Sequence, residues 1–137
     1  MGTRADFYIG RGKTAQWVCS IAWDGYPSGI PKKLLKATTQ EEFAAALKSF
    51  TAKRTDVTLP ADGWPWPWND SRTTDYAYAF DDGKVWASAF GYAWFDPLRK
   101  ERTIPEDAEK VADFPDMSSQ QNVTLGERSG VIVYGIG

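Results

Sequence analysis

A chain of 137 residues with 42% hydrophobic and 25% charged residues has the composition of a globular protein, and we expect a single domain over residues 1–137. The formal net charge of -2 argues against direct nucleic-acid binding, which depends on Lys and Arg side chains neutralising phosphates. No stretch approaches the roughly 20 consecutive apolar residues that span a bilayer, so we expect no membrane segment.

The first predicted elements are two strands, Ala5 to Ile9 and Gln16 to Ala22. They are separated by the glycine-containing turn 10–14, which is typical of a hairpin. In the second strand Trp17, Cys19 and Ile21 on one face alternate with Val18, Ser20 and Ala22 on the other. Both faces are therefore largely apolar or small, as expected of an interior strand.

Two helices are predicted next. The loop 23–31 holds two glycines and two prolines, and Pro31 is suited to begin a short helix through Lys36. Thr39 followed three residues later by Glu42 matches a capping box, and apolar residues then recur at helical spacing. The pattern predicts an amphipathic helix over residues 40–52.

Residues 53–73 show no periodicity and are rich in proline, so we expect a loop without a central strand. The clearest hairpin follows, with strands 74–80 and 84–92 around a turn that ends in Gly83. Its first strand alternates Tyr76, Tyr78 and Phe80 with Ala77 and Ala79. The small-residue face suits close packing by a helix, and the aromatic face suits a core or a binding platform.

A short helix over 105–112 and a last hairpin over 123–125 and 131–136 complete the predicted elements. The sequence therefore predicts an α+β fold: a mostly antiparallel sheet built from hairpins, with one or two helices packed on one face.

The residue types present leave few catalytic chemistries open. The chain has no histidine, which excludes Ser-His-Asp and Cys-His arrangements and most zinc sites. Cys19 is the only cysteine, so no internal disulfide forms, and a reducing compartment, the cytoplasm, is the simple interpretation. We predict no catalytic residue, no metal site and no cofactor.

Two aromatic loops are the candidate partner-binding residues. The segment Trp64-Pro65-Trp66-Pro67-Trp68 places three indoles in five residues. It is either a protein-binding edge or ring-stacking platform, or a belt that covers the open side of the sheet. The segment Trp23-Asp24-Gly25-Tyr26-Pro27 is either a presented contact loop or a turn whose rings cap the core. The predicted contacts are Trp64, Trp66, Trp68, Trp23, Asp24 and Tyr26.

The opening Met1-Gly2-Thr3-Arg4 and the later Trp23-Asp24-Gly25-Tyr26-Pro27-Ser28-Gly29 resemble a group of small proteins from bacteriophages, prophages and bacteria. The resemblance covers about the first thirty residues. It implies a phage accessory setting in the cytoplasm of a bacterial host. By analogy with anti-CRISPR proteins of similar size, this setting suggests a host-takeover or anti-defence role.

The leading hypothesis is a non-enzymatic protein that binds and inhibits or modulates a bacterial host protein complex. One alternative is a small hydrolase resembling the N-terminal-nucleophile type, although removal of Met1 exposes Gly2, which has no nucleophilic side chain. Another is a nucleic-acid mimic or binder, which the 18 acidic against 16 basic residues do not favour.

Overall fold

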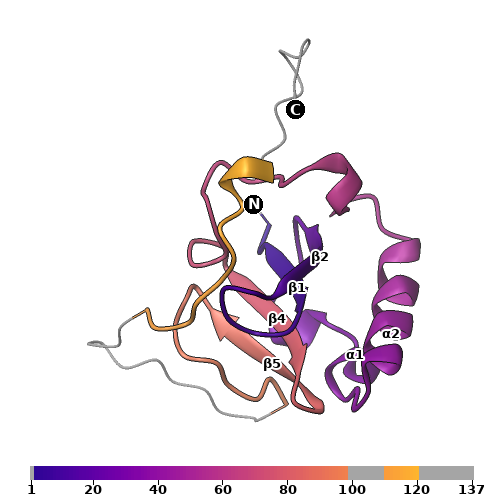
Figure 1. Ribbon diagram of the computed structural model, residues 1–137. Helices are drawn as coiled ribbons and strands as arrows, with labels where there is room; N and C mark the ends of the chain where they lie inside the picture. The colour runs from indigo at the N-terminus through magenta and orange to yellow at the C-terminus, as the bar shows by residue number, and fades with distance from the viewer. Residues whose placement is uncertain (1, 99–109, 121–137) are drawn as a thin grey trace.

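The computed structural model describes residues 2–98 and 110–120, which form a five-stranded sheet with helices on one side (Figure 1). The strand order across the sheet is β3-β2-β1-β4-β5. The strands are β1 (Ala5–Ile9), β2 (Gln16–Ile21), β3 (Val57–Thr58), β4 (Tyr76–Asp81) and β5 (Lys84–Ala89). The helices are α1 (Lys32–Leu35) and α2 (Gln40–Ala52), with 3-10 turns η1 (Pro27–Gly29), η2 (Pro60–Asp62) and η3 (Ser118–Gln120).

The predicted α+β class is confirmed. Among the strands of the described residues, the pairs β1–β2, β2–β3 and β4–β5 are antiparallel, and only β1–β4 is parallel. The chain between β1–β2 and β4 supplies both helices, which lie on one face of the sheet (Figure 1). One short strand was not predicted: β3 lies inside the segment 53–73 and pairs with Ser20 and Ile21.

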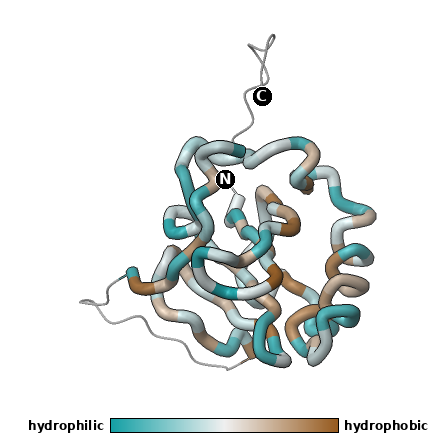
Figure 2. The backbone as a smooth tube through the Cα atoms, in the orientation of Figure 1, coloured by the Kyte–Doolittle hydropathy of each residue, from teal (hydrophilic) through white to brown (hydrophobic). Residues whose placement is uncertain are grey.

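The helix α2 follows its predicted bounds because its capping signals operate as expected. Thr39 Oγ1 accepts the backbone N–H of Glu42 at 3.1 Å. The carboxylate of Glu42 reaches one residue further back than a capping box requires, and accepts the backbone N–H of Thr38 at 2.9 Å. Hydrophobic and hydrophilic residues alternate along α2 (Figure 2), since only one side of the helix is buried.

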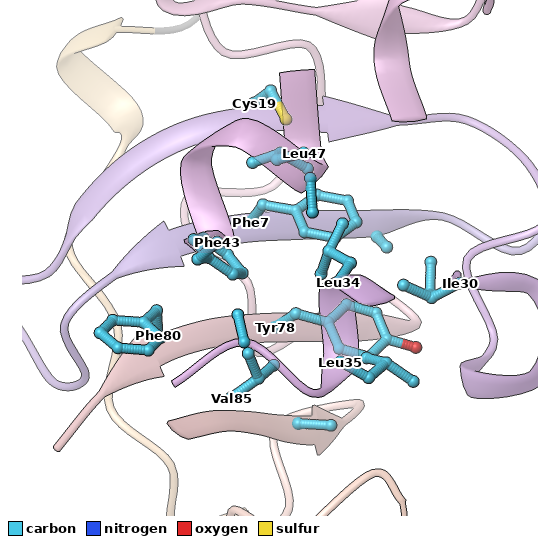
Figure 3. Packing of buried hydrophobic residues seen from close by; sticks show 14 of the residues in the cluster. Phe7, Cys19, Ile30, Leu34, Leu35, Phe43, Leu47, Tyr78, Phe80 and Val85 are labelled. Carbon is cyan, nitrogen blue, oxygen red and sulfur yellow. The ribbon is translucent and has the colours of Figure 1, made fainter. Parts of the chain in front are cut away.

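Two hydrophobic cores fill the two faces of the sheet. The helix-side core lies between the sheet and the two helices (Figure 3). Its large members include Phe7, Leu34, Phe43, Leu47 and Tyr78. The loop-side core lies on the opposite face, where segments without regular structure cover the sheet. Its members are Tyr8, Trp17, Trp64, Ala77, Ala79, Ala112, Phe114 and Met117.

The aromatic face of β4 forms a core, one of its two predicted roles, but the small-residue face is covered by loops and not, as predicted, by a helix. Tyr78 and Phe80 point into the helix-side core, whereas Ala77 and Ala79 lie in the loop-side core. Large side chains delivered by the covering loops, above all Trp64, require small residues beneath them on the sheet. The complementary volumes therefore place the aromatic side of β4 under the helices.

A β-bulge in β2 separates side chains that simple alternation groups together. Phe7 pairs with Cys19 and Tyr8 pairs with Trp17, so Val18 is left without a partner in β1. The extra residue turns Trp17 into the loop-side core, while Cys19 remains in the helix-side core. The prediction that Trp17, Cys19 and Ile21 share one face is wrong for Trp17 for this reason.

Strand β5 ends earlier than predicted. Phe90 and Gly91 both adopt positive φ, 53° and 85°. Their turn is closed by a 3.0 Å hydrogen bond from the Tyr92 N–H to the Ala89 carbonyl. Two successive residues with positive φ define a tight turn and interrupt the extended chain.

The predicted hairpin over 123–136 and most of the predicted helix over 105–112 lie outside the described residues. The described part of that helix, residues 110–112, has no helical structure. Within residues 2–98 and 110–120, no helix is both long and apolar enough to cross a membrane.

Candidate protein-binding surface

Trp64, the first indole of the tryptophan-proline segment, is part of the core. Its side chain is 1% exposed. The ring packs edge-on against Trp17, with centroids 5.2 Å apart, and its Nε1 donates to the carbonyl of Trp68 at 2.7 Å. Trp64 therefore has almost no surface to offer a partner.

The other two indoles are half-buried and satisfy polar groups below them. Trp66 and Trp68 stack on each other with centroids 5.6 Å apart. Trp66 Nε1 donates to Asp6 Oδ1 at 2.7 Å, and Trp68 Nε1 donates to Thr74 Oγ1 at 2.9 Å. The guanidinium of Arg4 lies over both rings, 5.7 and 5.4 Å from their centroids. The segment acts as a belt over the sheet; contact of Trp66 and Trp68 with a partner stays a prediction.

The belt covers a buried carboxyl group that sequence reasoning missed. Asp6 is fully buried and accepts hydrogen bonds from Ser20 at 2.6 Å, Ser71 at 2.6 Å and Trp66 at 2.7 Å. Ser71 is hydrogen-bonded in turn to the hydroxyl of Tyr8 at 2.7 Å. Burial raises the pKa of Asp6, and the hydrogen bonds offset only part of that rise. An aspartate inside an otherwise apolar strand was the available signal.

The second candidate loop is exposed. Trp23 is 45% exposed and Tyr26 is 40% exposed. Between them Asp24 adopts a φ of 62°, and its carboxylate accepts the Tyr26 hydroxyl at 3.2 Å. The loop therefore presents two large aromatic side chains to solvent instead of capping the core with them.

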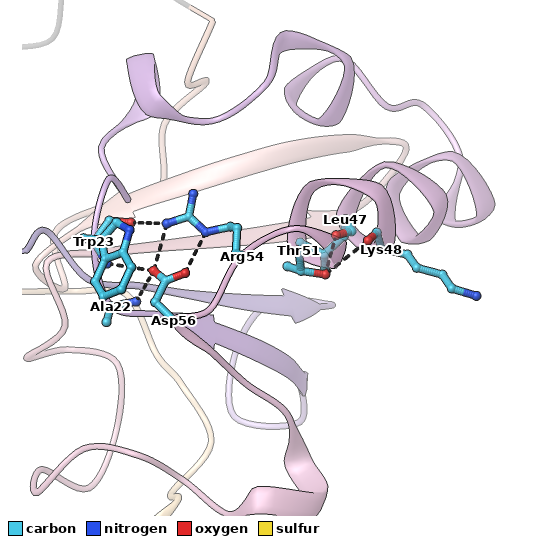
Figure 4. A network of polar contacts seen from close by, with 7 residues as sticks. All are labelled: Ala22, Trp23, Leu47, Lys48, Thr51, Arg54 and Asp56. Atoms are coloured by element: carbon cyan, nitrogen blue, oxygen red, sulfur yellow. Dashed lines mark hydrogen bonds and ion pairs between the residues drawn. The ribbon is translucent and has the colours of Figure 1, made fainter.

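An ion pair holds the start of this loop (Figure 4). Asp56 accepts the backbone N–H groups of Ala22 at 2.9 Å and Trp23 at 3.1 Å, and Arg54 donates to the Trp23 carbonyl at 2.7 Å. The Arg54 and Asp56 side chains are themselves 2.8 Å apart. Burial acts to raise the pKa of Asp56, but hydrogen bonds from Arg54 and the two N–H groups outweigh it and lower the pKa.

The middle of the loop is fixed at Gly25. Its N–H donates to the Thr3 carbonyl at 2.8 Å, and its carbonyl accepts the buried hydroxyl of Tyr78 at 2.6 Å. A Cβ atom at this position would lie 2.7 Å from the Cβ of Ala5, which no folded structure tolerates without a shift. Only glycine lets the loop lie this close to the start of β1.

The same end of the sheet carries a further exposed aromatic residue, Phe90, which was predicted to lie inside a strand. Phe90 is 42% exposed in the turn after β5, and the Lys110 ammonium lies 3.6 Å from its ring centroid. Its N–H donates to the Asp75 carbonyl at 3.0 Å. The Asp75 carboxylate accepts the Arg4 N–H at 2.9 Å and lies 3.5 Å from the Arg4 guanidinium. A Phe-Gly pair directly after a strand is the signal that indicates such a turn.

These residues form one region because β2 and β5 end where β1 and β4 begin. We call Trp23, Tyr26 and Phe90, with the Arg4–Asp75 ion pair, the aromatic end. The ends of β2 and β5 are three strand spacings apart, about 14 Å. A chain of hydrogen bonds connects them: Gly25 N–H donates to the Thr3 carbonyl, the next residue's N–H (Arg4) donates to the Asp75 carboxylate, and Phe90 N–H donates to the Asp75 carbonyl.

Comparison with known proteins finds no matching family model, no matching curated protein and no matching solved structure. In the described part of the chain, no three His, Cys, Asp or Glu side chains are grouped so as to hold a metal ion.

Proposed function

We propose that this chain is a non-enzymatic accessory protein of the phage type that binds a bacterial host protein complex in the cytoplasm and inhibits or modulates it. The aromatic end is its contact surface. The observation that carries the proposal is the exposure of Trp23 and Tyr26 on a loop that is held in place. The loop backbone donates hydrogen bonds to the Asp56 carboxylate and the Thr3 carbonyl, and accepts them from Arg54 and Tyr78.

The composition of the aromatic end supports a protein partner. Trp, Tyr and Arg are the residue types that contribute most binding energy at protein interfaces, and phenylalanine is enriched there as well. A rigid loop also loses little conformational entropy on binding. The roughly 14 Å between the ends of β2 and β5 fits within a standard interface of about 800 Å² per partner.

The phage setting comes from the sequence. The resemblance to phage and prophage proteins rests on Met1 to Arg4 and residues 23–29. The second of these segments holds two of the exposed rings, and Thr3 and Arg4 from the first hold the loop and the ion pair in place. Three residues that carry the resemblance, Arg4, Trp23 and Tyr26, thus belong to the proposed contact surface.

The test is a pull-down from bacterial lysate with the tagged protein and two variants. The first carries Trp23→Ala, Tyr26→Ala and Phe90→Asn, where asparagine accepts the positive φ of position 90. The control carries Leu59→Ala and Leu98→Ala, two exposed apolar residues outside the aromatic end.

The proposal is supported if the wild type and the control retain a host protein that the first variant loses. The circular dichroism spectrum of the first variant must match that of the wild type. Equal retention by both variants would place the contact elsewhere. Absence of any stoichiometric host partner for the wild type would overturn the function itself.

A further inference from the structure

A groove lies between β2 and α2, on the face of the sheet that the helices cover, and has a volume of about 400 Å³. This volume is in the range of small-molecule sites. None of its lining residues belongs to the aromatic end. The apolar lining residues are Ile9, Val18, Cys19, Phe43, Ala44, Leu47 and Leu59.

The bulge in β2 and the spacing of α2 explain why the groove is apolar. The extra residue, Val18, is partly buried against the helix-side core and contributes to the groove wall. On α2 the lining positions recur every three or four residues, so a single stripe of the helix faces the groove. Burial raises the pKa of Cys19 to about 12, so Cys19 contributes an uncharged thiol to the groove wall.

Few polar residues line the groove, and the charge among them is positive. Four residues supply it: Gln16, Gln40, Lys48 and Thr51. The hydroxyl of Thr51 already donates to the backbone carbonyl of Leu47 at 2.9 Å, and it lies 3.3 Å from the backbone carbonyl of Lys48 (Figure 4). The two amides and one ammonium are left to meet a ligand.

Among the described residues that line the groove, Lys48 is the only charged one. Its ammonium makes no ion pair with any residue in the ranges 2–98 and 110–120. The mobile lysine stem lets this charge reach the edge of an apolar surface. An apolar wall with a single unpaired cation is complementary to an apolar molecule with a single negative charge.

We propose that the groove between β2 and α2 binds a small amphipathic monocarboxylate, with its apolar body against Val18, Ala44 and Leu47 and its carboxylate paired with Lys48. This site goes beyond protein binding at the aromatic end and does not depend on it.

The probe is decanoate, added to the full-length ¹⁵N-labelled protein below its micelle concentration, with amide chemical shifts as the readout. We expect saturable shifts confined to the groove, at residues such as Val18, Ala44 and Leu47. Decyltrimethylammonium, with a similar body and the opposite charge, is expected to bind at least tenfold more weakly, and decanol to bind between the two.

Two pairs of variants assign the contacts. Lys48→Gln is expected to weaken decanoate binding about tenfold, the effect of losing one charge-assisted hydrogen bond, and to leave decanol binding unchanged. Lys53→Gln, an exposed lysine just beyond α2, is the matched control. Ala44→Leu narrows the groove and is expected to abolish binding of both molecules. Ala45 does not line the groove, so Ala45→Leu is expected to leave the binding of both molecules unchanged.

No saturable shifts, shifts outside the groove, or equal decanoate binding by Lys48→Gln and Lys53→Gln would overturn the proposal. So would broadening of the groove amides by a captured host protein in the absence of any decanoate binding, because the groove would then be a protein-docking surface.

Discussion

The carboxylate of Asp56 accepts the backbone N–H of Trp23 at 3.1 Å, across 33 positions of the sequence. The exposed tryptophan is therefore positioned by a residue of the segment between α2 and β3. Arg54 completes the arrangement from the other side, through the Trp23 carbonyl. Order in the loop and order in the α2–β3 connection are consequently coupled.

The first prediction follows from this coupling. Asp56→Ala leaves two backbone N–H groups and the Arg54 guanidinium without their acceptor. We expect it to lower the free energy of unfolding by about 1–3 kcal/mol, because a buried hydrogen-bonded partner is removed. Hydrogen exchange at Ala22 and Trp23 should accelerate more than exchange in β4. Urea unfolding and amide exchange measure the two effects.

Asp62→Ala is the matched control for Asp56→Ala, since Asp62 is an exposed aspartate whose carboxylate accepts the Leu59 N–H at 3.1 Å and no other bond from the described part of the chain. It should change the free energy of unfolding much less. Equal effects of the two substitutions would show that the Asp56 bonds do not hold the loop.

The second prediction separates a structural tryptophan from a surface one. Trp64→Ala removes an indole that is 1% exposed and leaves a cavity in the loop-side core, so we expect a loss of about 3–5 kcal/mol. Trp23→Ala removes an indole that is 45% exposed and should cost within about 0.5 kcal/mol. Thermal and urea unfolding measure both. A stable Trp64→Ala protein would contradict the packing of the belt.

The third prediction concerns the turn after β5. Phe90 has a φ of 53°, a conformation that costs a non-glycine residue about 1–2 kcal/mol and that asparagine tolerates. Phe90→Asn also removes the exposed contact with Lys110, worth about 0.5–1 kcal/mol. We expect a small net gain in stability in urea unfolding, together with weaker partner binding. A stabilised variant that binds normally would remove Phe90 from the contact surface.

The sequence predicted most of the local structure, because hairpin turns, the Thr39 cap and helical spacing are encoded by neighbouring residues. It did not predict the bulge at Val18, because a bulge depends on the register between two strands. The same limit applies to the burial of Trp64: its indole is covered through contact with Trp17, far away in the sequence. Phe90 was missed because a phenylalanine in a positive-φ turn contradicts local preference.

The last prediction is a pH dependence that originates at Asp6. Its pKa in the folded protein is raised above the ordinary 3.8, so the native state holds the proton more tightly than the unfolded chain. Stability that is present at low pH is therefore lost as the pH rises from about 4 toward the folded-state pKa, by at most about 1.4 kcal/mol per pH unit. When neutral, Asp6 is able to donate to Ser71, whose bond with Tyr8 accommodates either direction of donation.

Asp6→Asn cannot ionise and should lack this decline. The quantity to measure is the difference in free energy of unfolding between wild type and Asp6→Asn, from urea unfolding at several pH values between 4 and 8. Asp56, whose pKa is lowered, makes the free energy of unfolding rise with pH. This contribution is the same in both proteins, so it cancels in the difference. A wild type that gains stability over the variant as the pH rises would mean that the hydrogen bonds from Ser20, Ser71 and Trp66 outweigh burial. Asp6 would then be an ionised anchor for the tryptophan belt.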